Sequence, residues 1–192
     1  MMMDRLKAIG KKKLFLIQGG ILLIIILLVV LNWDRIQYRR AIAEFYDNYG
    51  NSFAMLNAMM PSDIQEEYHK EKLQDEGLTF EEYEKKLEEE YKDSQISCKY
   101  KILRAENLLR LYKFSPDNRL HITDLEQFKE KMYEHFGEYG FDPDLVKKAY
   151  MVEVEVKTER DAGKDVYEVT EHVIVYRYKN EWKFYITIAY DC

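Results

Sequence analysis

An unbroken apolar stretch dominates the hydrophobic pattern of this chain. Between Leu14 and Leu31, fifteen of eighteen residues are apolar and none is charged. A helix of this length is about 27 Å long, close to the thickness of a bilayer's hydrocarbon core. The pattern predicts a basic tail at residues 1–13, a membrane-spanning helix at residues 14–31, and one domain at residues 32–192.

A cleaved secretory signal is the alternative reading of this stretch, because it also begins with basic residues. Its apolar part is shorter and ends at a small-residue cleavage site, whereas Leu31 is followed by Asn32, Trp33 and Asp34. The sequence therefore favours a retained anchor.

The flanks of the anchor predict its orientation. Five Lys and Arg precede the apolar stretch on a short tail and three follow it closely, so the positive-inside rule favours a cytoplasmic N-terminus and an extracytoplasmic domain. The residues expected at the membrane interface are Lys11, Lys12, Lys13 and Trp33.

Helical periodicity continues after the anchor. Large apolar residues recur at steps of three and four and end at Pro61, which predicts one long helix with this face in the core: Tyr38, Ile42, Phe45, Tyr49, Phe53, Leu56 and Met60. Three capping-box patterns then mark the starts of further helices, at Ser62 with Gln65, Thr79 with Glu82, and Thr123 with Glu126.

The period changes to two at Gln95, which predicts a strand that fades near Asn107. Three more strands follow Asp142 and Pro143, separated by turns at 161–165 and Asn180, and such neighbours form an antiparallel meander. In the first of them Val152 and Val154 alternate with Glu153 and Glu155, so one sheet face should be covered and the other wet. Helices followed by a sheet predict an α+β fold.

Charge is divided sharply along the chain. Residues 1–40 carry a net charge of +6 and residues 41–192 a net charge of −12. An acidic domain repels phosphate backbones, so a nucleic-acid partner is not expected. No HExxH, CxxC, glycine-rich phosphate loop or nucleophile elbow occurs, and the sequence predicts no catalytic residue, metal site or cofactor.

The histidines are the remaining candidates for chemistry. His172 shares a strand face with Glu168, Thr170, Ile174 and Tyr176, whereas the face with Tyr167, Val169, Val173 and Val175 is the better core face. His172 should therefore face solvent or a partner. His69, His121 and His135 lie in charged or capping surroundings and are expected at the surface.

The order of these elements resembles the nuclear transport factor 2-like, or ketosteroid isomerase-like, cone fold, and in particular small membrane-tethered members from Gram-positive bacteria. The resemblance rests on the aromatic first helix, the YKILRAENL strand, the helix from Thr123, the AYMVEVEVKTE strand, and Val173 to Phe184. It implies helices packed on a curved, mainly antiparallel sheet. It names no function, because this fold hosts both enzymes and binding modules.

In the cone fold the first strand commonly lies beside the last, which would bring Cys98 near Cys192. A bridge between these two cysteines is one reading, and it would stabilise an extracytoplasmic domain by roughly 4–5 kcal/mol. One buried and one terminal free thiol is the other.

Together these features predict a membrane-anchored, non-enzymatic interaction or binding domain with the lipid bilayer and a cell-envelope protein as partners. One version is an assembly scaffold, since single-pass components of bacterial conjugation and secretion machines have a similar layout. The alternative is a small-molecule site or isomerase-like enzyme in the mouth of the cone. A deep pocket with a buried carboxylate or His would favour the enzyme, and a cone filled by aromatic side chains would favour the interaction domain.

Overall fold

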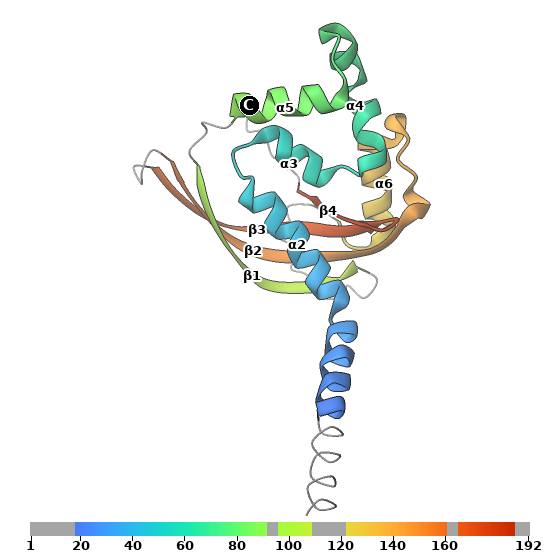
Figure 1. The fold of residues 1–192 in the computed structure, drawn as a ribbon, viewed down its shortest axis with the longest axis vertical. Coiled ribbons are helices and arrows are strands. Elements are labelled where there is room, and N and C mark those ends of the chain that lie inside the picture. The colour runs from blue at the N-terminus through green and yellow to red at the C-terminus, as the bar shows by residue number, and fades with distance from the viewer. Residues whose placement is uncertain (1–17, 92–95, 109–121, 161–164, 187–192) are drawn as a thin grey trace, which may run out of the picture. The chain divides into compact units, whose positions relative to one another are not determined.

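The computed structural model describes residues 18–91, 96–108, 122–160 and 165–186 (Figure 1). The chain divides into two compact units, Met1–Gln37 and Tyr38–Cys192. In the first unit, residues 18–31 are helical and Asn32 interrupts the helix before α2 (Trp33–Asp47) begins. No single described helix meets the length and hydropathy of a membrane span; Gln18–Leu31 and Trp33–Asp47 meet them only as a pair bent by 57°.

The predicted long helix to Met60 is wrong, because the structure has two helices there. α2 ends at Asp47, and four residues separate it from α3 (Ser52–Met59). Between them Gly50 has a φ of 97°, a conformation that L-residues rarely adopt. The side chain of Asn51 then accepts a hydrogen bond from the N–H of Ala54 at 3.0 Å and caps α3.

Two further helices, α4 (Ser62–Glu76) and α5 (Phe80–Tyr91), form an arm with a small core of its own. That core consists of Phe53 from α3, Leu73 from α4 and Tyr83 from α5, all buried. The predicted capping box of α5 is confirmed: Glu82 Oε2 accepts from the N–H of Thr79, and Thr79 Oγ1 accepts from the N–H of Glu82.

The sheet contains four antiparallel strands in the order β1-β2-β3-β4, which confirms the predicted meander and the α+β class. The strands are β1 (Ser97–Asn107), β2 (Val146–Arg160), β3 (Asp165–Tyr178) and β4 (Glu181–Tyr185). Between β1 and β2 lie α6 (Leu125–Phe136) and the short 3-10 turns η2 (Gly137–Tyr139) and η3 (Pro143–Leu145).

The helix α6 begins one residue later than predicted. Asp124, not Thr123, is its N-cap, and the Asp124 carboxylate accepts from the N–H of Gln127. Apolar residues recur along this helix at steps of three and four and are all buried: Leu125, Phe128, Met132 and Phe136.

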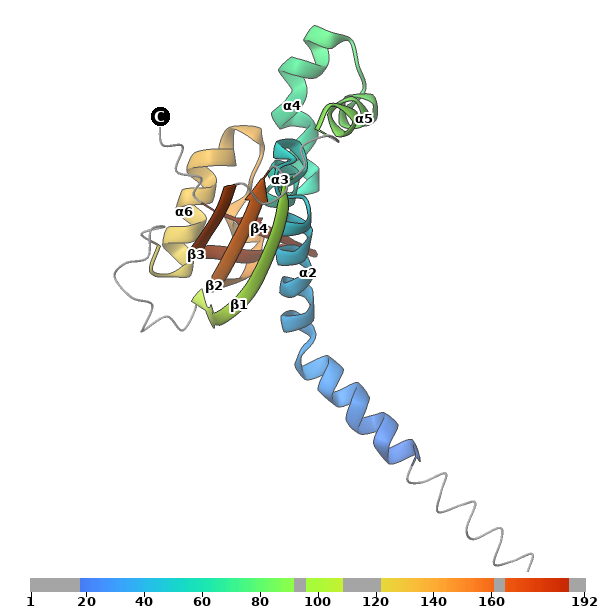
Figure 2. The same ribbon diagram turned by 90° about the vertical axis from the view of Figure 1, so that its left-hand side faces the viewer.

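Helices cover both faces of the sheet, α2 one face and α6 the other (Figure 2). The ring of Phe45 on α2 stacks on Phe184 with centroids 3.9 Å apart. On the opposite face, Phe128 of α6 packs against Tyr176 at 5.1 Å. The prediction of one wet face therefore holds only for part of that face. Glu153, Glu155 and Lys157 stay partly exposed there, whereas Met151, Ile174 and Tyr176 are buried.

Candidate functional site

The predicted anchor is represented by the helix of residues 18–31, since Leu14 to Ile17 lie outside the described residues. Every side chain from Ile21 to Leu31 is between 40% and 71% exposed. Eleven consecutive exposed apolar residues have no counterpart on an ordinary water-facing surface, where such patches are small. Within its own unit this helix therefore presents an unpartnered apolar surface on all sides.

The predicted interface residues are described only in part. Trp33 is the first residue of α2 and is 52% exposed. Lys11, Lys12 and Lys13 lie outside the described residues, so their interface role stays a prediction.

A carboxylate lies on the sheet face that α2 covers. Glu171 of β3 accepts a hydrogen bond of 2.7 Å from the hydroxyl of Tyr46, which is almost fully buried. Burial, followed by the negative charge of Glu171 and this hydrogen bond, raises the pKa of Tyr46. The phenol therefore stays protonated and acts as a donor to Glu171.

Aromatic rings surround this carboxylate–phenol pair. Tyr46 stacks on Tyr100 at 5.0 Å and on Tyr49 at 6.3 Å, and its edge meets Phe184 at 5.6 Å. Such close ring packing is typical of a core. The hydrogen bond between Tyr46 and Glu171 therefore acts as a buried polar contact that joins α2 to β3.

The thiol of Cys98 lies beside the same pair. Burial, together with the negative charges of Glu171 and Asp47, raises its pKa to about 11. A thiol with this pKa is protonated near neutral pH and is a poor nucleophile or metal ligand. Among the described residues, no group of three His, Cys, Asp or Glu side chains is arranged to hold a metal ion.

The expected disulfide of Cys98 stays a prediction, because Cys192 lies outside the described residues. The expectation assumed that the first strand lies beside the last, and the described strands are not arranged in this way. β1 pairs with β2 and β4 pairs with β3, so the first and last described strands occupy opposite positions in the strand order.

The histidines are placed differently from one another. His69 was expected at the surface, and this was wrong: it is 6% exposed and packs against Phe53 and Tyr83 in the core of the arm. Burial and then the charge of Lys72 lower its pKa, and its Nε2 has no hydrogen-bond partner among the described residues. His135 is exposed and His172 half-buried, in line with the prediction, and His121 lies outside the described residues.

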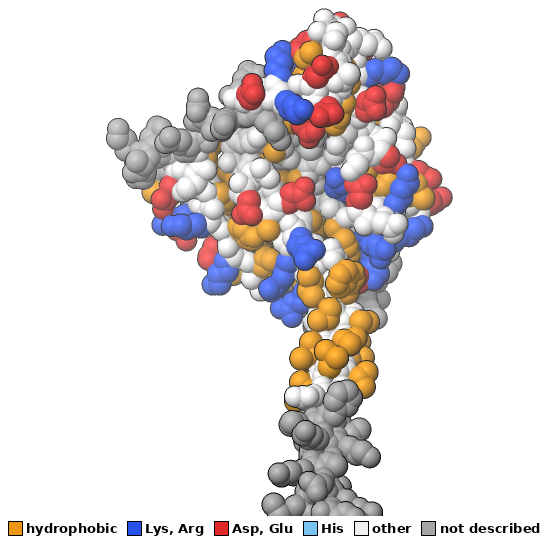
Figure 3. Space-filling model, viewed as in Figure 1, with side chains coloured by type: hydrophobic (Ala, Val, Ile, Leu, Met, Phe, Trp, Pro, Cys, Tyr) orange, Lys and Arg blue, Asp and Glu red, His pale blue; other side chains and the backbone are white. Residues whose placement is uncertain are grey.

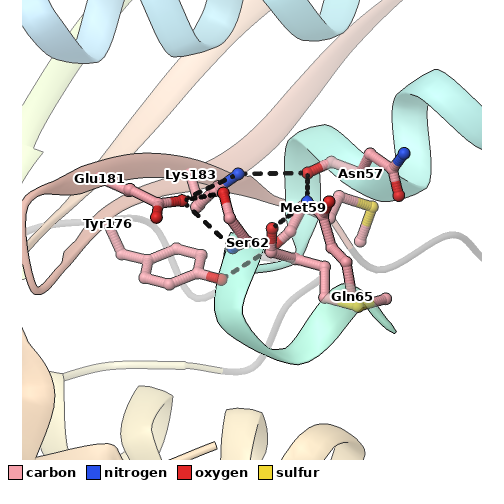
Figure 4. Close-up of polar contacts among 8 residues, drawn as sticks. Asn57, Met59, Ser62, Gln65, Tyr176, Glu181 and Lys183 are labelled. Carbon is pink, nitrogen blue, oxygen red and sulfur yellow. Dashed lines mark hydrogen bonds and ion pairs between the residues drawn. The ribbon is translucent and has the colours of Figure 1, made fainter. Parts of the chain in front are cut away.

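A second polar cluster, here the β4 bracket, consists of Ser62, Tyr176, Glu181 and Lys183 (Figure 4). Glu181 Oε2 accepts from the N–H of Ser62 at 3.2 Å and from its hydroxyl at 2.6 Å. Lys183, only 9% exposed, forms an ion pair of 3.2 Å with Glu181. The predicted Ser62–Gln65 capping box is therefore wrong: Pro61 is the N-cap of α4, and the Ser62 hydroxyl donates to the β4 carboxylate and does not cap the helix.

The β4 bracket also fixes the end of α3. The hydroxyl of Tyr176, a fully buried side chain, donates to the carbonyl of Met59 at 2.7 Å. Lys183 Nζ donates to the carbonyl of Asn57 at 3.4 Å, and the amide of Gln65 donates to the carbonyls of Asn57 and Met60. These bonds satisfy the helix-end carbonyls and clamp the α3–α4 connection to the sheet.

The domain surface separates its charges. The arm, residues 62–91, carries twelve Asp and Glu but only four Lys, a net charge of −8. Lys and Arg gather instead around the beginning of α2 and the adjacent end of the sheet (Figure 3). In the register of the sheet, Lys148 of β2 lies directly opposite Arg177 of β3.

Sequence reasoning missed two of these features for different reasons. Glu171 follows the alternation of Val169 and Val173, which places it on the apolar face, so a local signal existed. The β4 bracket left no such signal, because Ser62 and Glu181 are 119 positions apart.

No protein-family model matches the chain, and comparisons with curated proteins and with solved structures give no match.

Proposed function

We propose that the protein is a membrane-anchored interaction domain without catalytic activity of its own. The observation that carries this proposal is the exposed apolar helix of residues 21–31 joined to a domain whose core is closed by aromatic side chains. The helix serves as a single-pass anchor, with the basic N-terminus cytoplasmic and the domain extracytoplasmic. A protein of the cell envelope is the proposed partner.

The fold supports a nuclear transport factor 2-like domain as the interaction module. Its first helix, α2, covers one face of a curved antiparallel sheet, and α6 precedes the meander of β2, β3 and β4 (Figure 2). The arm of α4 and α5 adds a surface outside the main core, held there by its own core of Phe53, Leu73 and Tyr83. In this proposal the domain acts through its outer surfaces, where a partner protein can bind.

Membrane extraction of the full chain tests the anchor. We expect the protein to stay in the membrane pellet after alkaline carbonate, and the domain to be digested by protease added outside cells whose wall has been removed. Replacing Leu23 and Ile26 by Lys changes the insertion free energy by about 7 kcal/mol, against about −6 kcal/mol for the whole stretch. This variant should become extractable, and the matched variant with Val at both positions should not.

Two results contradict the proposal. A chain that is released by carbonate without any substitution has no spanning anchor. A domain that resists external protease but is cleaved in inverted vesicles lies on the cytoplasmic side.

The second candidate is a small-molecule or isomerase-like enzyme, and one observation favours it. Glu171 and the Tyr46 hydroxyl form a carboxylate–phenol pair on the sheet face that α2 covers, the combination that general acid–base chemistry uses. If this pair is catalytic, Glu171→Gln abolishes turnover of a bound substrate while the fold persists. If it is structural, Glu171→Gln changes stability alone.

A further inference from the structure

We infer that the basic end of the domain, defined by Arg39, Arg40, Lys148 and Arg177, docks on anionic lipid headgroups and so orients the domain with its acidic arm away from the bilayer. This inference rests on the proposed anchor. Beyond the anchor, it assigns a lipid-binding surface to the folded domain, and the ligand of this surface is the negatively charged phosphate of lipid headgroups.

The first step is the position of these cations within the domain. Lys148 and Arg177 face each other across β2 and β3, and Arg177 is paired on its other side with Trp182 of β4. The Trp182 ring lies 6.5 Å from Tyr38 of α2. Arg39 and Arg40 follow Tyr38 directly and are exposed, which brings all four cations to the end of the domain where α2 enters.

The second step is that two of these cations lack acidic partners. Other Lys and Arg of the domain pair with carboxylates, such as Lys179 with Asp63 and Arg104 with Glu106. Arg39 and Arg40 form no ion pair with any described residue.

The third step is reach. Six residues lie between Leu31 and Tyr38, so the two are at most about 25 Å apart as extended chain and about 10 Å apart as helix. The basic end therefore stays near the headgroups for as long as the anchor is inserted. At such a short tether the effective concentration of lipid is high, and a modest electrostatic attraction is enough to hold the contact.

The fourth step is the asymmetry of charge. The arm, with its net charge of −8, is the part of the domain that an anionic surface repels. Attraction at one end and repulsion at the other favour the same orientation.

Trp182 serves as the reporter, because it adjoins the basic end and is one of only two Trp residues. The full chain with Trp33→Phe is reconstituted in vesicles of phosphatidylcholine alone or with about 30% phosphatidylglycerol, each with a little headgroup-spin-labelled lipid as quencher. We expect about twofold more quenching of Trp182 in the anionic vesicles. About 0.5 M salt should remove the difference, because it shortens the Debye length to about 4 Å.

A charge variant and a matched control assign the effect to the basic end. Changing Arg39, Arg40, Lys148 and Arg177 to Gln should abolish the difference between the two vesicle types. The control changes Lys70, Lys72, Lys85 and Lys86 of the arm to Gln, removes the same charge and should retain the difference. Circular dichroism checks that the first variant is folded. If it is not folded, the salt titration of the Trp33→Phe chain with its basic end intact tests the inference.

Equal quenching in both vesicle types, or a difference between them that resists salt, overturns the inference. So does a difference that persists in the folded charge variant. Failure of the anchor itself is distinguishable, because the chain would then not sediment with either type of vesicle after carbonate.

Discussion

The carboxylate of Glu181 in β4 binds both the N–H and the hydroxyl of Ser62, the first residue of a helix 119 positions away. An acidic group at a helix N-terminus satisfies otherwise unbonded N–H groups and complements the helix dipole. Here the sheet supplies that group. The start of the arm is thereby coupled to the edge of the sheet.

Glu181→Gln should destabilise the domain by about 1 kcal/mol, a value reduced because the carboxylate is partly exposed. Burial alone would raise the pKa of Glu181, but the hydrogen bonds from Ser62 and the charge of Lys183 outweigh burial and lower it. The stabilisation is therefore present above the ordinary carboxyl pKa and is lost as pH falls through the lowered value. Urea unfolding at neutral pH and below pH ~4 measures it.

The control for this variant is Glu168→Gln, an exposed carboxylate on β3. It should leave the free energy of unfolding nearly unchanged at neutral pH. Equal losses from both variants would show that the Ser62 contact contributes nothing.

His69 should make the arm sensitive to mild acid. Its pKa is lowered by burial, so the unfolded chain binds the proton more readily than the folded one. Stability is then fully present above the unfolded pKa of about 6.5 and decreases as pH falls below it, by at most about 1.4 kcal/mol per pH unit. Thermal unfolding between pH 7.5 and 5.5, followed by hydrogen exchange in α4 and α5, measures this loss.

His69→Phe should flatten this pH dependence, because the pocket of Phe53 and Tyr83 accepts another ring. His135 has a pKa that is lowered by burial and by Lys131, so it acts in the same direction, and His135→Gln measures its share. If His69→Phe retains the full acid sensitivity, the buried imidazole is not its source.

Tyr46→Phe should destabilise the domain by about 1–3 kcal/mol, because it leaves the partly buried Glu171 without its hydroxyl donor. Tyr100→Phe, in the same aromatic stack, is the matched control, since its hydroxyl makes no hydrogen bond to another described residue. Chemical denaturation of the two variants gives the comparison. A cost for Tyr46→Phe no greater than for Tyr100→Phe would mean that the 2.7 Å hydrogen bond is energetically neutral.

Cys98 should be unreactive in the folded protein. With a pKa of about 11, its thiolate fraction at pH 8 is about 100-fold smaller than that of an ordinary thiol with a pKa near 9, and alkylation by iodoacetamide slows accordingly. Alkylation of the unreduced, denatured chain then decides the predicted bridge. Two modified thiols exclude a bond between Cys98 and Cys192, and none before reduction supports it.

Local patterns sufficed wherever an element depends on neighbours in the chain. The alternation of Val152 and Val154 with Glu153 and Glu155 gave the strand, and the spacing of Phe128, Met132 and Phe136 gave the buried face of α6. Thr79 and Glu82 formed the predicted cap because both partners lie within one helical turn.

Tertiary contacts decided the rest. The helical spacing of apolar residues continues through Gly50, although the backbone turns at this residue. The positive φ of Gly50 changes the direction of the chain and leaves the spacing of the apolar residues unaltered, so the pattern did not reveal the turn. Ser62 carried a capping sequence but found a stronger acceptor in Glu181, and the polar surroundings of His69 along the chain concealed the aromatic pocket that α3 and α5 close around it.

By itself the sequence determined the apolar helix that begins the chain, the meander of β2 to β4 and the α+β class, because periodicity and composition act over a few residues. Only the tertiary structure decided that α6 covers the second face of the sheet, that Tyr46 meets Glu171, and that the cations collect where α2 enters. Those relationships join residues far apart in the chain, such as Phe128 with Tyr176 and Tyr46 with Glu171, where sequence neighbours carry no record of the contact.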